Sequence, residues 1–73
     1  MLSASFARAR QYVAEAGRLL EEVYRNIGYV AESLTNDPKP AAQAQREEAE
    51  AFLEQVERAM EACARAQEIL TDD

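Results

Sequence analysis

The sequence predicts an all-α protein built from two long antiparallel helices, a coiled-coil-like helical hairpin. Apolar residues recur at alternating steps of four and three through the first half of the chain, which is the spacing of one buried helix face. The same spacing returns in the second half. A short polar segment containing Pro38 and Pro40 separates the two halves. We therefore expect one helical-hairpin domain over residues 1–73.

The first helix is predicted over about residues 3–35. Ser3 or Ser5 can cap it, because a serine oxygen accepts an unpaired N–H of the first turn. Gly17 and Gly28 weaken the helix relative to alanine, and Gly17 could leave room for Met60 across the hairpin. The inner face, called here the first seam, consists of Leu2, Phe6, Ala9, Val13, Ala16, Leu20, Val23, Ile27, Val30 and Leu34.

A turn is predicted at about residues 35–38, followed by a second helix over about residues 38–70. Asp37 is the expected N-cap, with Pro38 at the first helical position, where a missing N–H costs nothing. The loop is short, so the helices must be antiparallel neighbours. The second seam consists of Ala42, Ala49, Phe52, Val56, Ala59, Cys63, Ala66 and Leu70.

Pairing of residues whose numbers add to about 76 gives a consistent register between the two seams. Val13 then meets Cys63, and Val23 meets Phe52. Large residues tend to face small ones, as interdigitation requires. This register buries Cys63 in an apolar setting, where a thiol is unreactive.

Composition limits how such a chain can be stabilised. With 73 residues the core is marginal and usually needs disulfides, a metal or another chain. Cys63 is the single cysteine and there is no histidine, so we expect neither a disulfide within the chain nor a metal site. Association with a protein partner or with a second copy is the remaining source of stability.

The charge distribution disfavours anionic partners. The net charge is −6, and all of it falls in residues 36–73, because the first 35 residues carry four Arg and four Glu. Direct nucleic-acid binding and binding to an anionic membrane both need a basic surface. We see neither a signal sequence nor a membrane span, and the lone thiol fits a reducing compartment, so we expect a cytoplasmic protein.

Enzymatic activity is not expected. General acid–base catalysis needs groups held together in a concave, partly dry pocket, and two helices form no such pocket. The sequence therefore predicts no catalytic residue, no cofactor and no small-molecule substrate.

Apolar residues beyond the two seams predict a docking surface for another helix or a second copy. Two helices rarely bury enough area to offset the loss of chain entropy. The alternative is that these residues wrap the edges of the hairpin itself. The candidate contacts are Tyr12, Leu19 and Ile69 on one side, Tyr24, Leu53 and Met60 on the other, and Tyr29 as an exposed residue.

A second candidate surface is an acidic ridge along the second helix. It could imitate a nucleic acid in the basic groove of a partner. The interpretation that we favour is a solvated face that keeps the protein soluble, since Arg58 and Arg65 interrupt it. The ridge consists of Glu47, Glu50, Glu54, Glu57, Glu61 and Glu68.

The chain also resembles a known family in its length, its hairpin plan and one run of sequence. The run extends from Asp37-Pro38 through Gln45-Arg46-Glu47 into Ala51-Phe52-Leu53-Glu54. In these it resembles the small cytoplasmic E-type co-chaperones of type III secretion needle assembly. The resemblance implies a hairpin that, with a helical-repeat partner, keeps the needle subunit soluble. Rop-like plasmid regulators, which are four-helix dimers that bind paired RNA loops, share the plan, but this chain lacks a basic RNA-binding face.

These observations favour a non-enzymatic protein-binding module, such as a small adaptor, co-chaperone or inhibitor. The alternative is an acidic phage-type inhibitor that blocks a nucleic-acid-binding complex.

Overall fold

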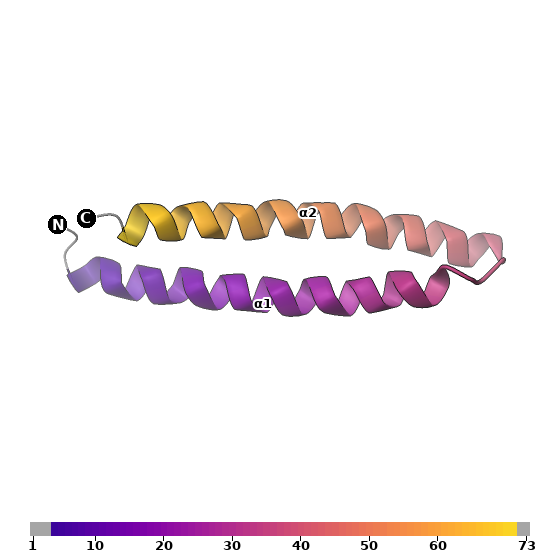
Figure 1. Ribbon diagram of the computed structural model, residues 1–73, viewed down its shortest axis with the longest axis horizontal. Helices are drawn as coiled ribbons and strands as arrows, with labels where there is room; N and C mark the ends of the chain where they lie inside the picture. The colour runs from indigo at the N-terminus through magenta and orange to yellow at the C-terminus, as the bar shows by residue number, and fades with distance from the viewer. Residues whose placement is uncertain (1–3, 72–73) are drawn as a thin grey trace.

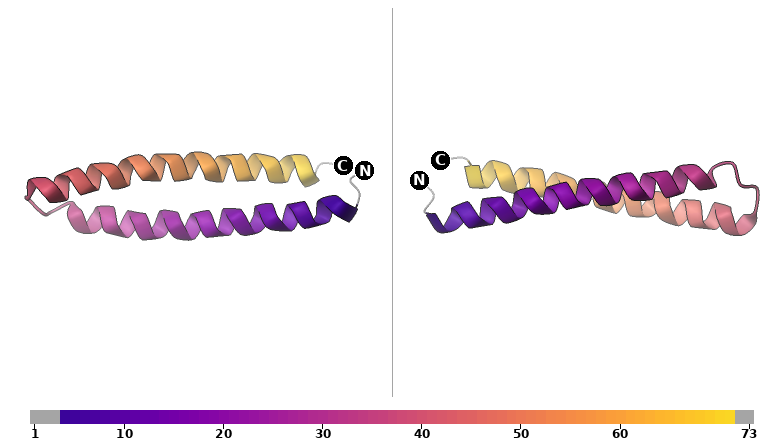
Figure 2. Two further views of the ribbon diagram at one scale, coloured as in Figure 1. Left: turned by 180° about the vertical axis from the view of Figure 1, so that it is seen from behind. Right: turned by 90° about the horizontal axis from the view of Figure 1, so that it is seen from below.

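The described part of the chain, residues 4–71 of a computed structural model, forms two helices and no strand. Helix α1 (Ala4–Leu34) and helix α2 (Pro40–Thr71) run antiparallel side by side (Figure 1). Two further views show them crossing at a shallow angle (Figure 2). The molecule measures 56 × 14 × 12 Å, so the hairpin is a long rod made of a single layer of two helices. The predicted all-α hairpin is confirmed.

The start of α1 differs from one of the two capping predictions. Helix α1 begins at Ala4, which places Ser5 inside the helix rather than at its N-cap. Ser3, the other predicted cap, and Leu2 of the first seam lie outside the described residues.

Side-chain and backbone hydrogen bonds close the C-terminal end of α1. The Thr35 N–H donates to the Glu32 carbonyl oxygen at 3.2 Å, and the Thr35 Oγ1 hydroxyl donates to the Ala31 carbonyl oxygen at 3.0 Å. The Asp37 N–H donates to the Leu34 carbonyl oxygen at 3.2 Å. These bonds satisfy carbonyl groups that have no partner within a helix end. The turn therefore forms without a glycine and without a positive φ angle in residues 4–71.

Helix α2 begins at Pro40, two residues later than predicted. The Gln43 N–H donates to the Lys39 carbonyl oxygen at 3.1 Å, so Lys39 is the N-cap and Pro40 the first helical residue. The prediction that Asp37 caps a helix starting at Pro38 is wrong, because a residue that precedes a proline is pushed out of the α conformation. Lys39 precedes Pro40 and cannot be helical.

Asp37 has a different role, as the anchor of the loop. Its Oδ1 accepts a hydrogen bond from the Lys39 N–H at 3.0 Å, which is an Asx turn. Its carbonyl oxygen accepts a hydrogen bond from Gln43 Nε2 at 2.6 Å. The side chain and the backbone of one loop residue thus hold the first turn of α2 in place.

The register of the two helices differs from the predicted one by about one helical turn. A Cβ built on Gly17 would lie 3.9 Å from Cys63 Cβ, and Tyr24 Oη lies 2.8 Å from Glu57 Oε1. The residue numbers in these pairs add to 80 and 81, not to 76. Consequently Gly17, not Val13, lies against Cys63. The shift follows from the loop, because α2 starts two residues late and extends past the end of α1 (Figure 1).

The hairpin buries little of its apolar surface. Among the described residues only Ala42 and Val56 are buried, at 6% and 5% exposure. Four residues predicted to lie in the seams are instead exposed, because a single neighbouring helix covers only a narrow strip of each partner. These seam residues are Phe6, Val23, Val30 and Phe52. Val23 and Phe52 therefore do not form the predicted core pair.

Replacing Gly28 with alanine is expected to stabilise the hairpin by about 1 kcal/mol, because glycine is the poorest non-proline residue in a helix interior. A Cβ at Gly28 would meet no atom within 4 Å, so the added methyl group causes no clash. Gly17→Ala is the comparison, since its Cβ would make ordinary contact with Cys63 at 3.9 Å. Urea unfolding followed by circular dichroism measures both. A lower midpoint for Gly28→Ala would contradict this expectation.

Candidate protein-docking face

The surface of the hairpin carries a continuous apolar face, which takes residues from both helices. On α1, steps of seven, four and seven residues keep the contributing side chains on one side of the helix. On α2, steps of seven, three and seven do the same. The large members are 38% to 72% exposed. The apolar face consists of Tyr12, Leu19, Val23 and Val30 on α1 and of Phe52, Ala59, Ala62 and Ile69 on α2.

The observed register brings these residues together as layers across the hairpin. Leu19 lies level with Ala62, and Tyr12 with Ile69, since the numbers in each pair add to 81. By the same rule Val30 lies level with Phe52, because their numbers add to 82. The layers follow one another along most of the rod, so the face is a long stripe rather than an isolated patch.

The apolar face carries no charged side chain between its first and last layers. The remaining positions along it, read from the helical repeat, are Ala16 and Asn26 on α1 and Gln55 and Ala66 on α2. Asn26 and Gln55 lie level with each other, because their numbers also add to 81. The stripe is therefore apolar with one uncharged polar layer.

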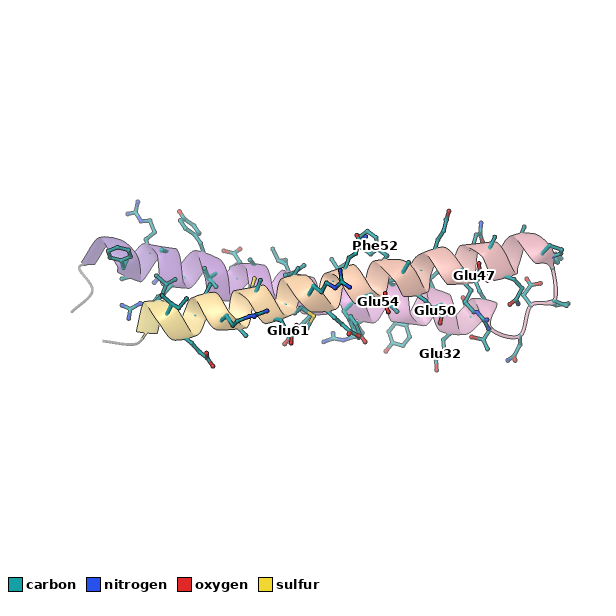
Figure 3. The ribbon with its side chains drawn as sticks, turned by 90° about the horizontal axis from the view of Figure 1, so that it is seen from above. Glu32, Glu47, Glu50, Phe52, Glu54 and Glu61 are labelled. Carbon is teal, nitrogen blue, oxygen red and sulfur yellow. The ribbon has the colours of Figure 1, made fainter. Side chains whose placement is uncertain are left out.

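The opposite side of the hairpin is polar and is marked by a hydrogen bond between the helices. The Tyr24 Oη hydroxyl donates to Glu57 Oε1 at 2.8 Å. Figure 3 shows Phe52 at one edge of the hairpin and Glu32, Glu50 and Glu61 at the other. Open grooves on this polar face are lined by side chains of both signs of charge, among them Glu21, Arg25, Glu57 and Arg58.

The hydrogen bond to Glu57 raises the pKa of Tyr24 above the ordinary value of 10.0, with smaller effects from the Glu57 charge and from desolvation. A raised pKa in the folded state means that this contact stabilises the hairpin fully below pH 10.0 and is lost as the pH rises through the raised value. Glu57→Ala is expected to return the pKa toward 10.0. Absorbance titration in a Tyr12→Phe, Tyr29→Phe background isolates Tyr24. An unchanged pKa would contradict the contact.

The predicted docking residues fall on both faces. Tyr12, Leu19 and Ile69 lie on the apolar face, and Tyr12 and Ile69 are 64% and 72% exposed. Tyr24, Leu53 and Met60 are half-buried, so the hairpin itself covers part of each side chain. This matches the alternative interpretation that residues on this side wrap the hairpin's own edge. Tyr29 is exposed, as predicted, but lines a groove on the polar face.

Sequence reasoning missed three large members of the apolar face, Val23, Val30 and Phe52, because it assigned them to the seams. The signal that could have found them is their spacing. Val23 follows Leu19 by four residues and precedes Val30 by seven, which places all three on one side of α1. Two seams of this width are broader than one helix–helix contact can bury.

The predicted acidic ridge is partly engaged within the hairpin. Glu57 accepts the hydrogen bond from Tyr24, so it lies beside α1 rather than opposite it. Glu50 Oε1 lies 3.3 Å from Arg46 Nε, which makes an ion pair along α2. Glu68 is exposed near the end of α2 and also has an interaction partner. The other members of the ridge, Glu47, Glu54 and Glu61, are exposed on α2 (Figure 3).

Two further features bear on other kinds of site. Cys63 is half-buried between the helices, next to Gly17. Within residues 4–71, no group of three or more Cys, Asp or Glu side chains is arranged to hold a metal ion. Neither described helix has a stretch that is long and apolar enough to cross a membrane.

Comparisons with protein-family models, with curated proteins and with solved structures gave no significant match.

Proposed function

We propose that this protein is a non-enzymatic binding module that packs its apolar face against helices of another chain. The observation that carries the proposal is the charge-free stripe from Tyr12 and Ile69 to Val30 and Phe52, whose large side chains are exposed. Contiguous exposed apolar surface of this kind marks interaction sites in soluble proteins. A helix laid on a long apolar groove or stripe is a common mode of recognition.

The total exposed surface supports the same proposal. The hairpin exposes 5751 Å², whereas a compact monomer of 8.2 kDa exposes about 4,500 Å². The difference of about 1,200 Å² is spread over the whole surface of a rod 56 Å long, and packing another chain along the apolar face would reduce it.

An adaptor, a co-chaperone and an inhibitor are all forms of this function. A co-chaperone role like that of the E-type proteins of type III secretion is supported by the hairpin plan. A cytoplasmic location fits the lone Cys63 and remains part of the proposal.

A photo-cross-linking amino acid placed at Leu19 in the source cell tests the proposal directly. Position 19 lies in the middle of the apolar face, and its side chain is 49% exposed. The expected result is a cross-link to a protein chain. The matched control carries the same amino acid at Glu54, which is exposed on the outer surface of α2 and should give a weaker product or none.

The alternative, an acidic inhibitor that occupies a basic groove, predicts the reverse pattern. Cross-links would form at Glu54 and not at Leu19. The double variant Glu54→Lys, Glu61→Lys would then lose binding, and added salt would weaken it through screening. That combination of results would overturn the proposed apolar mode.

A further inference from the structure

We infer that the chain occupying the apolar face is a second copy of this protein, and that the two hairpins form a four-helix bundle with both loops at the same end. The inference rests on the proposed function and names the partner. It depends on the shape of the hairpin and on two features of the apolar face, its charge environment and its single polar layer.

The shape of the hairpin fits a dimer of this chain. A single layer of two helices exposes about 1,200 Å² more than a compact chain of its mass, and a second hairpin laid on the apolar face would make a thicker, more compact bundle. Both surfaces would then be apolar stripes of equal length with the same seven-residue spacing. Stripes with this spacing on two hairpins can interdigitate along their full length.

The polar layer decides which way the second hairpin runs. If both loops lie at the same end, a twofold axis runs along the rod, and α1 of one copy faces α2 of the other. Asn26 of one copy then lies opposite Gln55 of the second copy, and each amide can hydrogen-bond the other. If the loops lie at opposite ends, Asn26 and Gln55 face apolar or unrelated layers. A buried amide without a partner is costly, so the polar layer favours the same-end arrangement.

The same arrangement also matches side-chain sizes across the interface. Leu19 of one copy faces Ala62 of the second copy, which pairs a large residue with a small one. Tyr12 faces Ile69 of the second copy, and Val30 faces Phe52 of the second copy. The residue pairs that lie level within one hairpin are thus the same pairs that face each other between the two copies.

The distribution of charge favours the arrangement with both loops at the same end over the one with the loops at opposite ends. Helix α2 holds seven Glu and three Arg, whereas α1 holds four Glu and four Arg. With the loops at the same end, the two acidic α2 helices lie diagonally and each faces a neutral α1. In the bundle with opposite loops and antiparallel neighbours, α2 packs directly on α2 and the like charges approach. The dimer therefore keeps its acidic surfaces apart.

Spin-label distance measurements on the purified full chain test both the partner and the direction. In a Cys63→Ala background, a label at Asn36→Cys marks the loop and a label at Glu22→Cys marks the middle of the rod; both positions are exposed. Same-end loops predict a loop-to-loop distance of roughly 30 Å or less, from helix spacings of about 8–10 Å plus two label arms. Opposite-end loops predict a distance near the 56 Å length of the rod.

The label at Glu22→Cys is the control, because the middle of the rod gives a short distance in either arrangement. A short distance there together with a long distance at Asn36→Cys would overturn the same-end arrangement. Asn26→Leu combined with Gln55→Leu removes the polar layer and is expected to add the long loop-to-loop distance as a second population. A single short distance in that variant would show that the polar layer does not set the direction.

Sedimentation of the unlabelled chain separates failure of this inference from failure of the proposed function. A helical monomer at high micromolar concentration would overturn the second copy as partner. If the cross-linker at Leu19 still captured a different protein in the cell, the proposed function would stand. A monomer together with no cross-link at Leu19 would overturn both.

Discussion

Replacing Val56 with aspartate is expected to unfold the hairpin at about 25 °C. Val56 is 5% exposed, the most enclosed apolar side chain among the described residues, and it lies in the middle of α2. An unpaired carboxylate at this site would lose its hydration without gaining a partner, which costs several kcal/mol. Small proteins have only about 5–15 kcal/mol of stability in total, and a hairpin that buries so little lies at or below the lower end.

Graded and matched variants make this prediction specific. Val56→Ala removes two methyl groups without adding charge and is expected to cost about 1–3 kcal/mol. Ala51→Asp introduces the same charge on the exposed outer surface of the same helix and should cost only about 1–2 kcal/mol, from lower helix propensity and repulsion by the neighbouring Glu47, Glu48 and Glu54. Circular dichroism with thermal unfolding ranks the three variants. A folded Val56→Asp chain, or an equal loss in Ala51→Asp, would show that Val56 does not hold the helices together.

Replacing Leu19 with aspartate is expected to abolish self-association and, with it, any dependence of the melting temperature on protein concentration. Two carboxylates enter each dimer interface, one per copy, so the dissociation constant should rise by about a thousandfold or more. The wild-type melting temperature should increase with concentration, because association stabilises the folded state by mass action.

The double variant Glu54→Lys, Glu61→Lys is the control for Leu19→Asp. It changes the charge by a larger amount but on the exposed surface of α2, away from the apolar face. It should retain the concentration dependence. Leu53→Asp is a poorer test, because Leu53 is half-buried and its replacement would also weaken the hairpin. A concentration-independent melting temperature in the wild type would contradict the expected association.

The helices could be predicted from the sequence because each depends on local information. The four-and-three spacing of apolar residues predicted helices over about residues 3–35 and 38–70, close to the observed Ala4–Leu34 and Pro40–Thr71. The start of α2 was missed by two residues because two prolines compete for the first helical position. Pro40 takes that position, since it keeps the preceding Lys39 out of the α conformation.

The register and the docking face could be predicted only in part, because both depend on where the loop places α2. Pairing by apolar spacing alone gave a solution one turn away from the observed one, and every turn offers a similar apolar match. The hydrogen bond between Tyr24 and Glu57 accompanies the observed register, and apolar spacing does not consider such polar contacts. Tyr12, Leu19 and Ile69 were placed correctly on the surface, whereas Val23 and Phe52 were expected in the core.

The single loop at one end of the rod makes the resistance of the hairpin to mechanical force depend on direction. The open ends of α1 and α2 lie together at the end opposite the loop (Figure 1). A force that separates these ends loads one layer of contacts at a time, so the helices unzip at low tension. A force applied between the loop and one open end acts along the helices and loads all layers at once in shear. Tethers at residues near these points would therefore rupture at very different tensions.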